Sequence, residues 1–167
     1  MRHLGISATE HDPDSVLGIV ETGLIDVVQV IYNIFDQTPE TRLLPLARKR
    51  NIGILARVPL DEGALSGRFT ADIQFPEGDF RAWYFRGNRR REVVEHVDAL
   101  QRDLGGESLP DTALRFCLSH PAVSSVIPGM RTRAHVESNT ALSERGPLPA
   151  EMLAILKRHA WDRNYYT

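Results

Sequence analysis

The sequence predicts an α/β fold with a parallel sheet, and three observations support this prediction. Short hydrophobic runs alternate along the 167 residues with segments in which apolar residues recur at helical spacing. The first helical segments begin at a capping residue followed by proline and end at glycine or basic residues. Each connection is long enough for the crossover helix that parallel strands need. We therefore expect four successive strand–helix units.

The element boundaries follow from caps and periodicity. Asp12 is a predicted N-cap with Pro13 at the first helical position, and Gly23 ends that helix. The run 25–32 is rich in β-branched residues with almost no alternation, which indicates a strand buried on both faces. The expected strands are 3–7, 25–32, 51–57 and 123–127, and the expected helices are 13–22, 38–50, 91–104, 111–120, 130–139 and 149–160.

Residues 60–91 interrupt this alternation with a long loop excursion. A connection of this length in a compact domain is usually functional or disordered. Its aromatic side chains are interleaved with arginines, a mixture that can stack on and neutralise single-stranded nucleic acid. The formal net charge of −2 opposes that interpretation. We expect instead a lid over a ligand or a segment that packs on the neighbouring surface.

Composition indicates one globular domain spanning residues 1–167. With 42% apolar residues, the chain can bury one sizeable core. Its net charge gives no bulk attraction to nucleic acid or to an anionic membrane, and no apolar run is long enough to span a bilayer. The N-terminus lacks the apolar core of a signal peptide, so we expect a cytoplasmic protein. Cys117 is the single cysteine, which excludes an internal disulfide and indicates a small core residue.

The segment 123–139 has the features of an anion-binding site. A short buried strand is expected to stop at Pro128, and Gly129 lets the backbone turn and approach a ligand. A helix is predicted to follow directly, with its free N–H groups and positive dipole end directed at the ligand. Arg131 and Arg133 add positive charge where a helix does not itself favour cations. The alternative is an ordinary strand-to-helix turn with two solvated arginines.

Two architectures remain open on these grounds, a doubly wound sheet and part of a (β/α)8 barrel. The glycine fingerprint that would favour the doubly wound sheet does not follow the first strand. Five motifs, in order and spacing, resemble the aldo-keto reductases; they lie at 5–7, 28–33, 53–67, 113–116 and 126–139. The resemblance implies a TIM-barrel type fold, of which this chain supplies strands five to eight and the C-terminal helix. A complete barrel needs about 250 residues, so about half of one is expected.

The resemblance also implies a site for NADPH. Arg131 and Thr132 resemble the family positions that hold the adenosine 2′-phosphate, and the loop after the third strand resembles the one that wraps the pyrophosphate. Ser7 and Gln29 fall where the family holds the nicotinamide carboxamide. The expected cofactor-binding residues are Ser7, Gln29, Arg57, Pro59, Leu60, Gly63, Leu65, Ser66, Gly67, Gly129, Met130, Arg131, Thr132, His135 and Asn139.

The sequence departs from the family pattern at important positions. Ala8 stands where the family usually has an asparagine that contacts the carboxamide, and alanine cannot make that hydrogen bond. Arg57 replaces the aromatic residue that commonly stacks on the nicotinamide, although a guanidinium plane can also stack. The family's catalytic tyrosine and its partners come from the first half of the barrel, which no segment here resembles. We therefore assign no catalytic residue.

Ionisable residues are also expected at the face where barrel enzymes carry out catalysis. His11, Asp12 and Asp14 follow the first strand, and Asp61 and Glu62 follow the third. Acid–base catalysis or metal binding there is one interpretation. The simpler one is that Asp12 caps a helix, Asp14 favours its first turn and the other acids are solvated. No histidine-rich spacing supports a metal, so no metal site is expected.

Half a barrel would leave its first and last strands as open edges. We therefore expect a homo-oligomer or a partner chain. The function implied is an oxidoreductase that uses NADPH to reduce an aldehyde or ketone, with the catalytic acid supplied by a missing or separate N-terminal half. The alternatives are a non-catalytic nucleotide-binding or interaction module, and a truncated barrel repurposed as a cofactor-independent lyase or isomerase that uses His11, Asp12 or Arg57.

Overall fold

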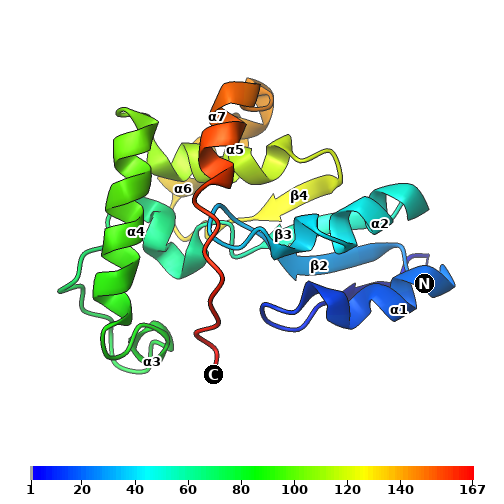
Figure 1. Cartoon of the computed structure of the whole chain (residues 1–167), viewed down its shortest axis with the longest axis horizontal. Helices are drawn as coiled ribbons and strands as arrows, with labels where there is room; N and C mark the ends of the chain where they lie inside the picture. The colour runs from blue at the N-terminus through cyan, green and yellow to red at the C-terminus, as the bar shows by residue number, and fades with distance from the viewer. Residues whose placement is uncertain (1) are drawn as a thin grey trace.

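The structure is a computed structural model that describes residues 2–167, and within that range it contains one parallel sheet (Figure 1). Neighbouring strands in the sequence are also neighbours in the sheet. Its strands are β1 (Gly5–Ser7), β2 (Val27–Ile31), β3 (Gly53–Arg57) and β4 (Val123–Ile127). The predicted α/β class with four successive parallel units is confirmed.

The helices lie close to the predicted segments, except for one short helix inside the excursion, where none was predicted. They are α1 (Leu17–Thr22), α2 (Leu43–Arg50), α3 (Arg81–Tyr84), α4 (Arg89–Leu104), α5 (Leu109–Ser119), α6 (Arg133–Ala141) and α7 (Ala150–Lys157). Gly23 ends α1 in the left-handed conformation, as predicted. The cap predicted at Asp12 is wrong: its side chain makes no capping hydrogen bond, and residues 13–16 form a 3-10 turn. The Asp12 carbonyl accepts instead from the Ser15 hydroxyl.

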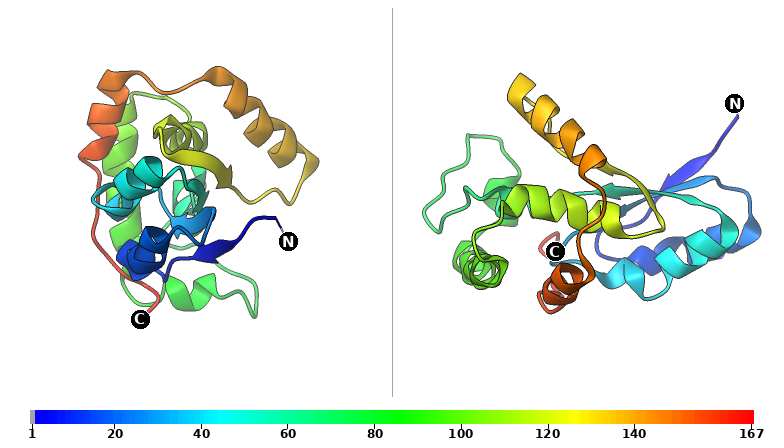
Figure 2. Two further views of the ribbon diagram at one scale, coloured as in Figure 1. Left: turned by 90° about the vertical axis from the view of Figure 1, so that its right-hand side faces the viewer. Right: turned by 90° about the horizontal axis from the view of Figure 1, so that it is seen from above.

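Helices cover only one face of the sheet. Val28 and Ile54, which pair across β2 and β3, are fully buried on the face toward the helices. Gln29 and Leu55, the next pair on the opposite face, are only partly buried. Figure 2 shows α1 and α2 together on the same side of the strands. The prediction that 25–32 is buried on both faces is therefore wrong, because within residues 2–167 no complete layer packs on the second face of the sheet.

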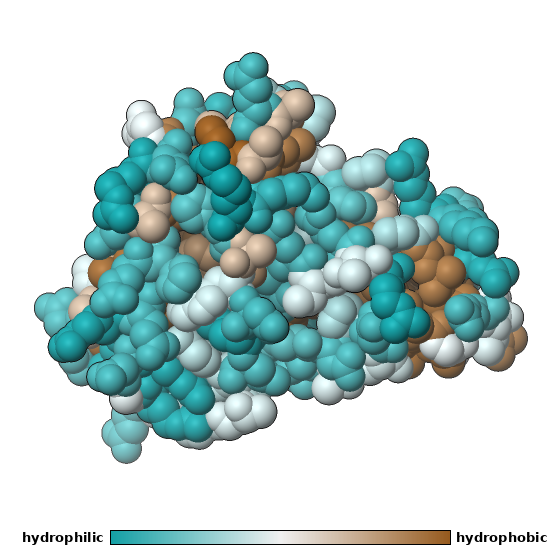
Figure 3. Space-filling view, in the orientation of Figure 1, coloured by the Kyte–Doolittle hydropathy of each residue, from teal (hydrophilic) through white to brown (hydrophobic). Residues whose placement is uncertain are grey.

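The edge strands carry exposed apolar side chains. Ser124 and Ser125 of β4 are exposed, and Ile127 keeps 46% of its surface in contact with solvent. Leu4 beside β1 is also exposed, as is Leu24 before β2 at 68%. Figure 3 shows apolar surface at the end of the molecule near α1 and α2. The predicted burial of strand 123–127 is wrong because β4 is an edge strand, which within residues 2–167 has a neighbouring strand on one side only.

The long excursion packs through its own aromatic residues. The rings of Phe69 and Tyr84 each lie with their centroids 4.7 Å from that of Phe85, and all three side chains are buried. Phe80 and Trp83 remain exposed. The packing interpretation of these aromatics therefore holds for the buried rings.

The last residues cross the carboxyl ends of the strands. Helix α7 ends at Lys157, before the predicted end at residue 160, and residues 158–167 continue without regular structure past β2 and β3 (Figure 1). We call residues 158–167 the tail. The backbone N–H of Trp161 donates to the Phe35 carbonyl at 2.8 Å, which fixes the tail to the loop after β2. No helix within residues 2–167 is long and apolar enough to cross a membrane.

Candidate functional site

A cavity of about 770 Å³ opens at the carboxyl ends of β3 and β4. Four segments form its walls: the loop directly after β3, the rest of the excursion, the start of α5, and the connection from β4 into α6. The lining residues from these segments are Val58, Pro59, Leu60, Glu62, Gly63, Ser66, Arg68, Phe69, Ile73, Phe75, Phe80, Arg81, Ile127, Pro128, Gly129, Arg131, His135, Ser138 and Asn139, with Pro110 and Asp111 from α5.

The wall after β3 is a tight loop with an unusual backbone. We call residues 58–66 the strained loop, because Val58, Asp61 and Glu62 have φ values of 55°, 51° and 55°. Left-handed conformations of residues other than glycine cost about 1–3 kcal/mol each and persist only where the surrounding structure holds them. Gly63, with φ of 100°, adopts its conformation without that cost. The turn lets the backbone of the loop face the cavity.

The wall after β4 differs from the predicted arrangement. Helix α6 begins at Arg133, after Pro128 and Gly129 and three further residues, so the expectation that it follows the glycine directly is wrong. The reason is the cap: the Thr132 hydroxyl accepts from the backbone N–H of His135 at 3.2 Å and sets the first turn there. The Asn139 amide donates to the Gly129 carbonyl at 3.4 Å, which ties the helix to the turn.

The two arginines of the predicted anion site have different environments. Arg131 lines the cavity. Arg133 points away; its side chain is 92% exposed and pairs with Glu137 one helical turn later at 2.6 Å. The anion-site interpretation therefore stays a prediction for Arg131, and Arg133 is a solvated arginine.

Positive charge is not fully neutralised in the cavity. Within residues 2–167, neither Arg68 nor Arg131 has a carboxylate within 4.0 Å. At the rim Arg81 pairs with Asp79 at 2.6 Å, and this hydrogen bond lowers the pKa of Asp79 to about 2. Burial raises the pKa of Glu62, which reduces its tendency to carry negative charge. The arrangement suits an anionic ligand.

The structure brings eight of the predicted cofactor-binding residues together around this cavity: Pro59, Leu60, Gly63, Ser66, Gly129, Arg131, His135 and Asn139. The other predicted residues lie outside its lining. Leu65 is buried in the core, Met130 is exposed, Gly67 ends the 3-10 turn of residues 61–66 and Thr132 caps α6.

Ser7, Gln29 and Arg57 lie on the sheet beside the cavity. Ser7, the last residue of β1, is paired in register with Gln29, the central residue of β2. Arg57 ends β3 and lies 3.5 Å from the Glu10 carboxylate. These three residues belong to the successive strands β1, β2 and β3, and their assignment to a cofactor site stays a prediction.

Several lining residues were not predicted. Arg68, Phe75 and Arg81 come from the excursion, and Pro110 comes from the start of α5. The available signal was the length of the excursion, since a connection that long in a compact domain is usually functional or disordered. Which of these side chains face the cavity depends on how the excursion folds back on the strained loop.

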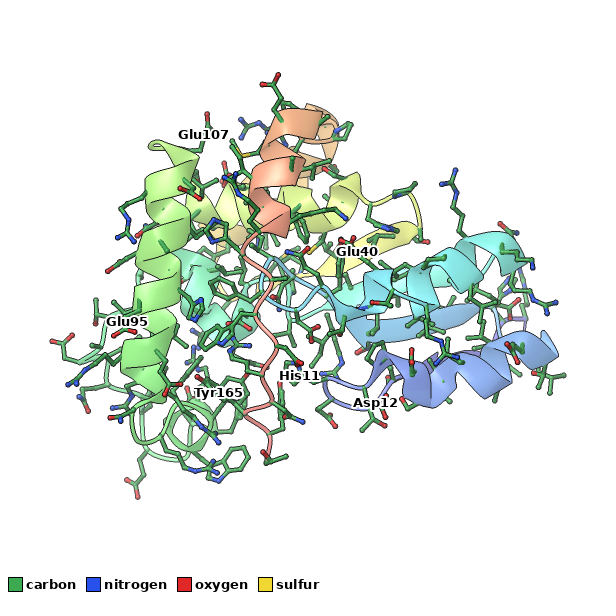
Figure 4. All side chains as sticks on the ribbon, viewed as in Figure 1. His11, Asp12, Glu40, Glu95, Glu107 and Tyr165 are labelled. Carbon is green, nitrogen blue, oxygen red and sulfur yellow. The ribbon has the colours of Figure 1, made fainter. Side chains whose placement is uncertain are left out.

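A second group of ionisable residues lies beneath the tail. His11 Nδ1 lies 2.6 Å from Asp36 Oδ2, and the His11 side chain is only 7% exposed. Figure 4 shows His11 where the loop after β1 meets the tail, and the Tyr166 ring lies 5.5 Å from the His11 ring. Asp61 forms a buried ion pair with Arg163. These residues do gather at the mouth of the half-barrel, but they contact one another and the tail.

The remaining candidates for chemistry are structural. Asp14 forms an exposed ion pair with Arg42. Cys117 is buried, and its thiol donates to the Tyr32 carbonyl at 3.2 Å. Within residues 2–167 no three His, Cys, Asp or Glu side chains are grouped to hold a metal ion.

The geometry can be compared with known proteins. The model of the Aldo/keto reductase family matches residues 1–160. The chain belongs to the aldo/keto reductase family. Its parallel sheet is accordingly about half of the barrel of that family, as expected from the motifs.

This aldo/keto reductase chain resembles several characterised relatives. It is 29% identical over 141 residues to the NADH-specific methylglyoxal reductase of Escherichia coli, a match that covers 81% of this chain and 42% of the relative. It is also 29% identical over 155 residues to the aflatoxin B1 aldehyde reductase member 2 of Rattus norvegicus, with the same two coverages. The chain thus spans less than half the length of these relatives.

Solved structures of the family superpose on this chain. An aldo-keto reductase from Bacillus halodurans in its holo form has a TM-score of 0.70 and 26% identity, covering 95% of this chain and 48% of its own. A glycerol dehydrogenase from Gluconobacter oxydans has a TM-score of 0.74 and 26% identity, covering 98% and 51%. The family uses nicotinamide cofactors and carbonyl substrates, so the cavity is a candidate cofactor site.

Proposed function

We propose that this chain is the cofactor-binding half of an aldo/keto reductase that uses NADPH to reduce an aldehyde or ketone. The observation that carries the proposal is the cavity, in which Arg131, His135 and Asn139 face the strained loop across a shared space. NADPH supplies hydride to a carbonyl carbon. The role of these residues is to hold the cofactor, with Arg131 binding the 2′-phosphate and backbone N–H groups of the loop binding the pyrophosphate.

The fit of the cavity supports this assignment. Its volume of about 770 Å³ lies within the range of cofactor sites. A Cβ atom placed on Gly129 would meet nothing within 4 Å, so the backbone there is open to a ligand. Arg68 and Arg131 offer two cations for the phosphates of a dinucleotide, and aromatic side chains from the excursion supply the apolar wall.

The catalytic acid is proposed to come from outside this chain. Burial raises the pKa of each of the four tyrosines, Tyr32, Tyr84, Tyr165 and Tyr166, whereas a general acid needs a lowered one. Three of their hydroxyls donate to glutamates: Tyr32 to Glu40, Tyr165 to Glu92 and Tyr166 to Glu62. None is poised to protonate a substrate carbonyl.

We further propose that another polypeptide segment covers the open edges of β1 and β4. It is either a second copy of this chain or a chain carrying the first half of the barrel. The exposed side chains of Leu4 and Ile127 at the two edges support this proposal. Multi-angle light scattering of the purified chain tests for self-association.

A fluorescence titration with NADPH, with NADH for comparison, tests the cofactor proposal. The informative variants are Arg131→Ala, which removes a cavity cation, and Arg133→Ala, which removes the neighbouring solvated one. Loss of a charge-assisted hydrogen bond to phosphate weakens binding about 10- to 100-fold. We expect that loss for NADPH in Arg131→Ala and little change for NADH or for Arg133→Ala.

The outcomes separate the candidate functions. Equal effects of the two substitutions, or no preference for NADPH, contradict the role of Arg131 as the 2′-phosphate ligand. Binding without turnover, even after a first half of the barrel is added, identifies a nucleotide-binding module. Cofactor-independent turnover that is lost in His11→Ala would identify a repurposed enzyme, but the burial of His11 beneath Tyr166 does not favour it.

A further inference from the structure

We propose that Arg163 and Tyr166 of the tail are positioning residues that hold the strained loop in the shape that binds the dinucleotide. The inference rests on the proposed function, because it takes the cavity to bind a dinucleotide. It assigns a role to two residues that lie outside the cavity lining. It makes the tail part of the cofactor site without any direct contact between the tail and the cofactor.

The strained loop needs an external support. Its own hydrogen bonds are short-range, from the N–H of Asp61 to Val58, and from the N–H groups of Gly63 and Leu65 to Leu60. These contacts close the turn but do not explain why Asp61 and Glu62 keep left-handed backbones, which residues with a Cβ avoid. The side chains of these same two residues make the contacts with the tail.

The first contact is a buried ion pair. Arg163 donates through Nη2 to Asp61 Oδ2, and the two side chains are 5% and 1% exposed. The guanidinium lies 4.4 Å from the Trp161 ring centroid and 4.9 Å from that of Tyr165, so it is held between two rings of the tail. Within residues 2–167, the other two guanidinium nitrogens of Arg163 have no hydrogen-bond partner. The Arg163 guanidinium is therefore oriented by its contact with Asp61.

The second contact lies one residue further along the loop. The Tyr166 hydroxyl donates to Glu62 Oε1 at 2.6 Å. Glu62 also lines the cavity, so this hydrogen bond acts on a residue of the binding wall itself. Two consecutive strained residues are thus held by two side chains of the same tail.

The tail is in turn anchored to elements away from the strained loop. Arg89 of α4 donates to the Tyr165 carbonyl at 2.8 Å, and the Tyr165 hydroxyl donates to Glu92 at 2.7 Å. Figure 4 shows Tyr165 on the side of the tail that faces α4. Together with the hydrogen bond from Trp161 to the loop after β2, these contacts fix the position of the tail next to the strained loop.

The test compares variants of the tail that each change one contact with the strained loop. Arg163→Ala removes the ion pair, Arg163→Lys restores a charge toward Asp61, and Tyr166→Phe removes one hydroxyl. The matched control is Tyr32→Phe, which removes a buried tyrosine hydroxyl that donates to a glutamate, Glu40, outside both the tail and the strained loop. Two properties are measured: hydrogen exchange at the amides of residues 58–66, and affinities for NADPH and for 2′,5′-ADP, a fragment that lacks the nicotinamide half.

We expect exchange at the amides of Asp61, Gly63 and Leu65 to accelerate about tenfold or more in Arg163→Ala and less in Tyr166→Phe. The affinity for NADPH should fall about five- to twentyfold, whereas the affinity for 2′,5′-ADP should change less than about twofold, because the fragment depends mainly on α6. Arg163→Lys should recover part of the loss. Tyr32→Phe should leave both properties as in the wild type.

Unchanged exchange in both Arg163→Ala and Tyr166→Phe would overturn the proposal. So would an equal loss of affinity for NADPH and for the fragment, since that indicates general loss of structure rather than a displaced loop. If the wild type binds neither ligand, the proposed function fails, and the exchange data still decide whether the tail holds the loop.

Discussion

Replacement of Asp36 by asparagine is expected to destabilise the protein much more than the same change at an exposed ion pair. Asp36 is almost fully buried after β2. Its Oδ2 accepts from His11 at 2.6 Å, and its Oδ1 accepts from the Thr38 hydroxyl at 2.5 Å and from the Thr38 N–H at 3.2 Å. Asparagine keeps one oxygen for Thr38 but presents an amide nitrogen to the His11 N–H.

The expected loss of stability follows from the hydrogen bonds and the charge that Asp36→Asn removes. A hydrogen bond to a charged group contributes about 1.5–3 kcal/mol, and removing one member of a buried pair leaves the other without compensation. We therefore expect Asp36→Asn to lower the free energy of unfolding by about 2–3 kcal/mol. For a chain of this length that corresponds to a fall in Tm of about 4–12 °C.

The assay is thermal unfolding followed by circular dichroism at pH 7.5, with Asp14→Asn as the control. Asp14 pairs with Arg42 at 2.8 Å on the surface, where such pairs contribute about 0.5 kcal/mol or less. Burial alone would raise the pKa of Asp36, but hydrogen bonds from His11 and Thr38 outweigh it and hold the pKa below 3.8. The stabilisation is therefore present above pH 3.8 and lost as the pH falls through the lower folded pKa.

The difference in Tm between the wild type and Asp36→Asn should accordingly become smaller below about pH 4. A Tm change in Asp36→Asn no larger than that in Asp14→Asn would refute the importance of the buried pair. A difference that stays constant from pH 7.5 to pH 3 would refute the assignment of the effect to the Asp36 charge.

Three further predictions follow. Burial raises the pKa of Glu62 above 4.5, so the stabilising contribution of this residue is lost as the pH rises through the folded value. Glu62→Gln should therefore have the same Tm as the wild type at pH 4 and a higher Tm at pH 7.5. Equal Tm values of the two proteins at both pH values would contradict this. Burial also raises the pKa of the Cys117 thiol, so a thiol reagent should label it in denaturant but not in the folded protein. Ile127→Asp places a charge on the open edge and should reduce self-association measured by light scattering; an unchanged oligomer would exclude that edge from the interface.

Local signals in the sequence were sufficient for the class of fold and for part of the site. Hydrophobic periodicity placed the strands, and Gly23 marked the end of α1, because both depend on residues adjacent in the chain. The motifs around Gly63 and Gly129 identified two walls of the cavity. Two of the errors, the predicted burial of β2 on both faces and of β4, have a common origin, because both assumed neighbouring structure that is not among residues 2–167.

The contacts between distant residues were not predictable in the same way. Arg163 and Asp61 are 102 residues apart, and His11 and Asp36 are 25 apart. Neither pair has a spacing that a helix or strand would impose. Arg131 and Arg133 carry the same charge two positions apart, yet one lines the cavity and the other is solvated, because the Thr132 cap sets where α6 begins.

The sequence by itself determined the four parallel strand–helix units and the family, and it supplied the candidate residues for a cofactor site, because propensity, periodicity and motif spacing are properties of neighbouring residues. Only the tertiary structure decided which of those residues share a cavity, which arginine lines it, and which side chains of the tail contact the strained loop. These features depend on distant segments being buried together, where an unpaired charge is costly and a paired one is fixed in place.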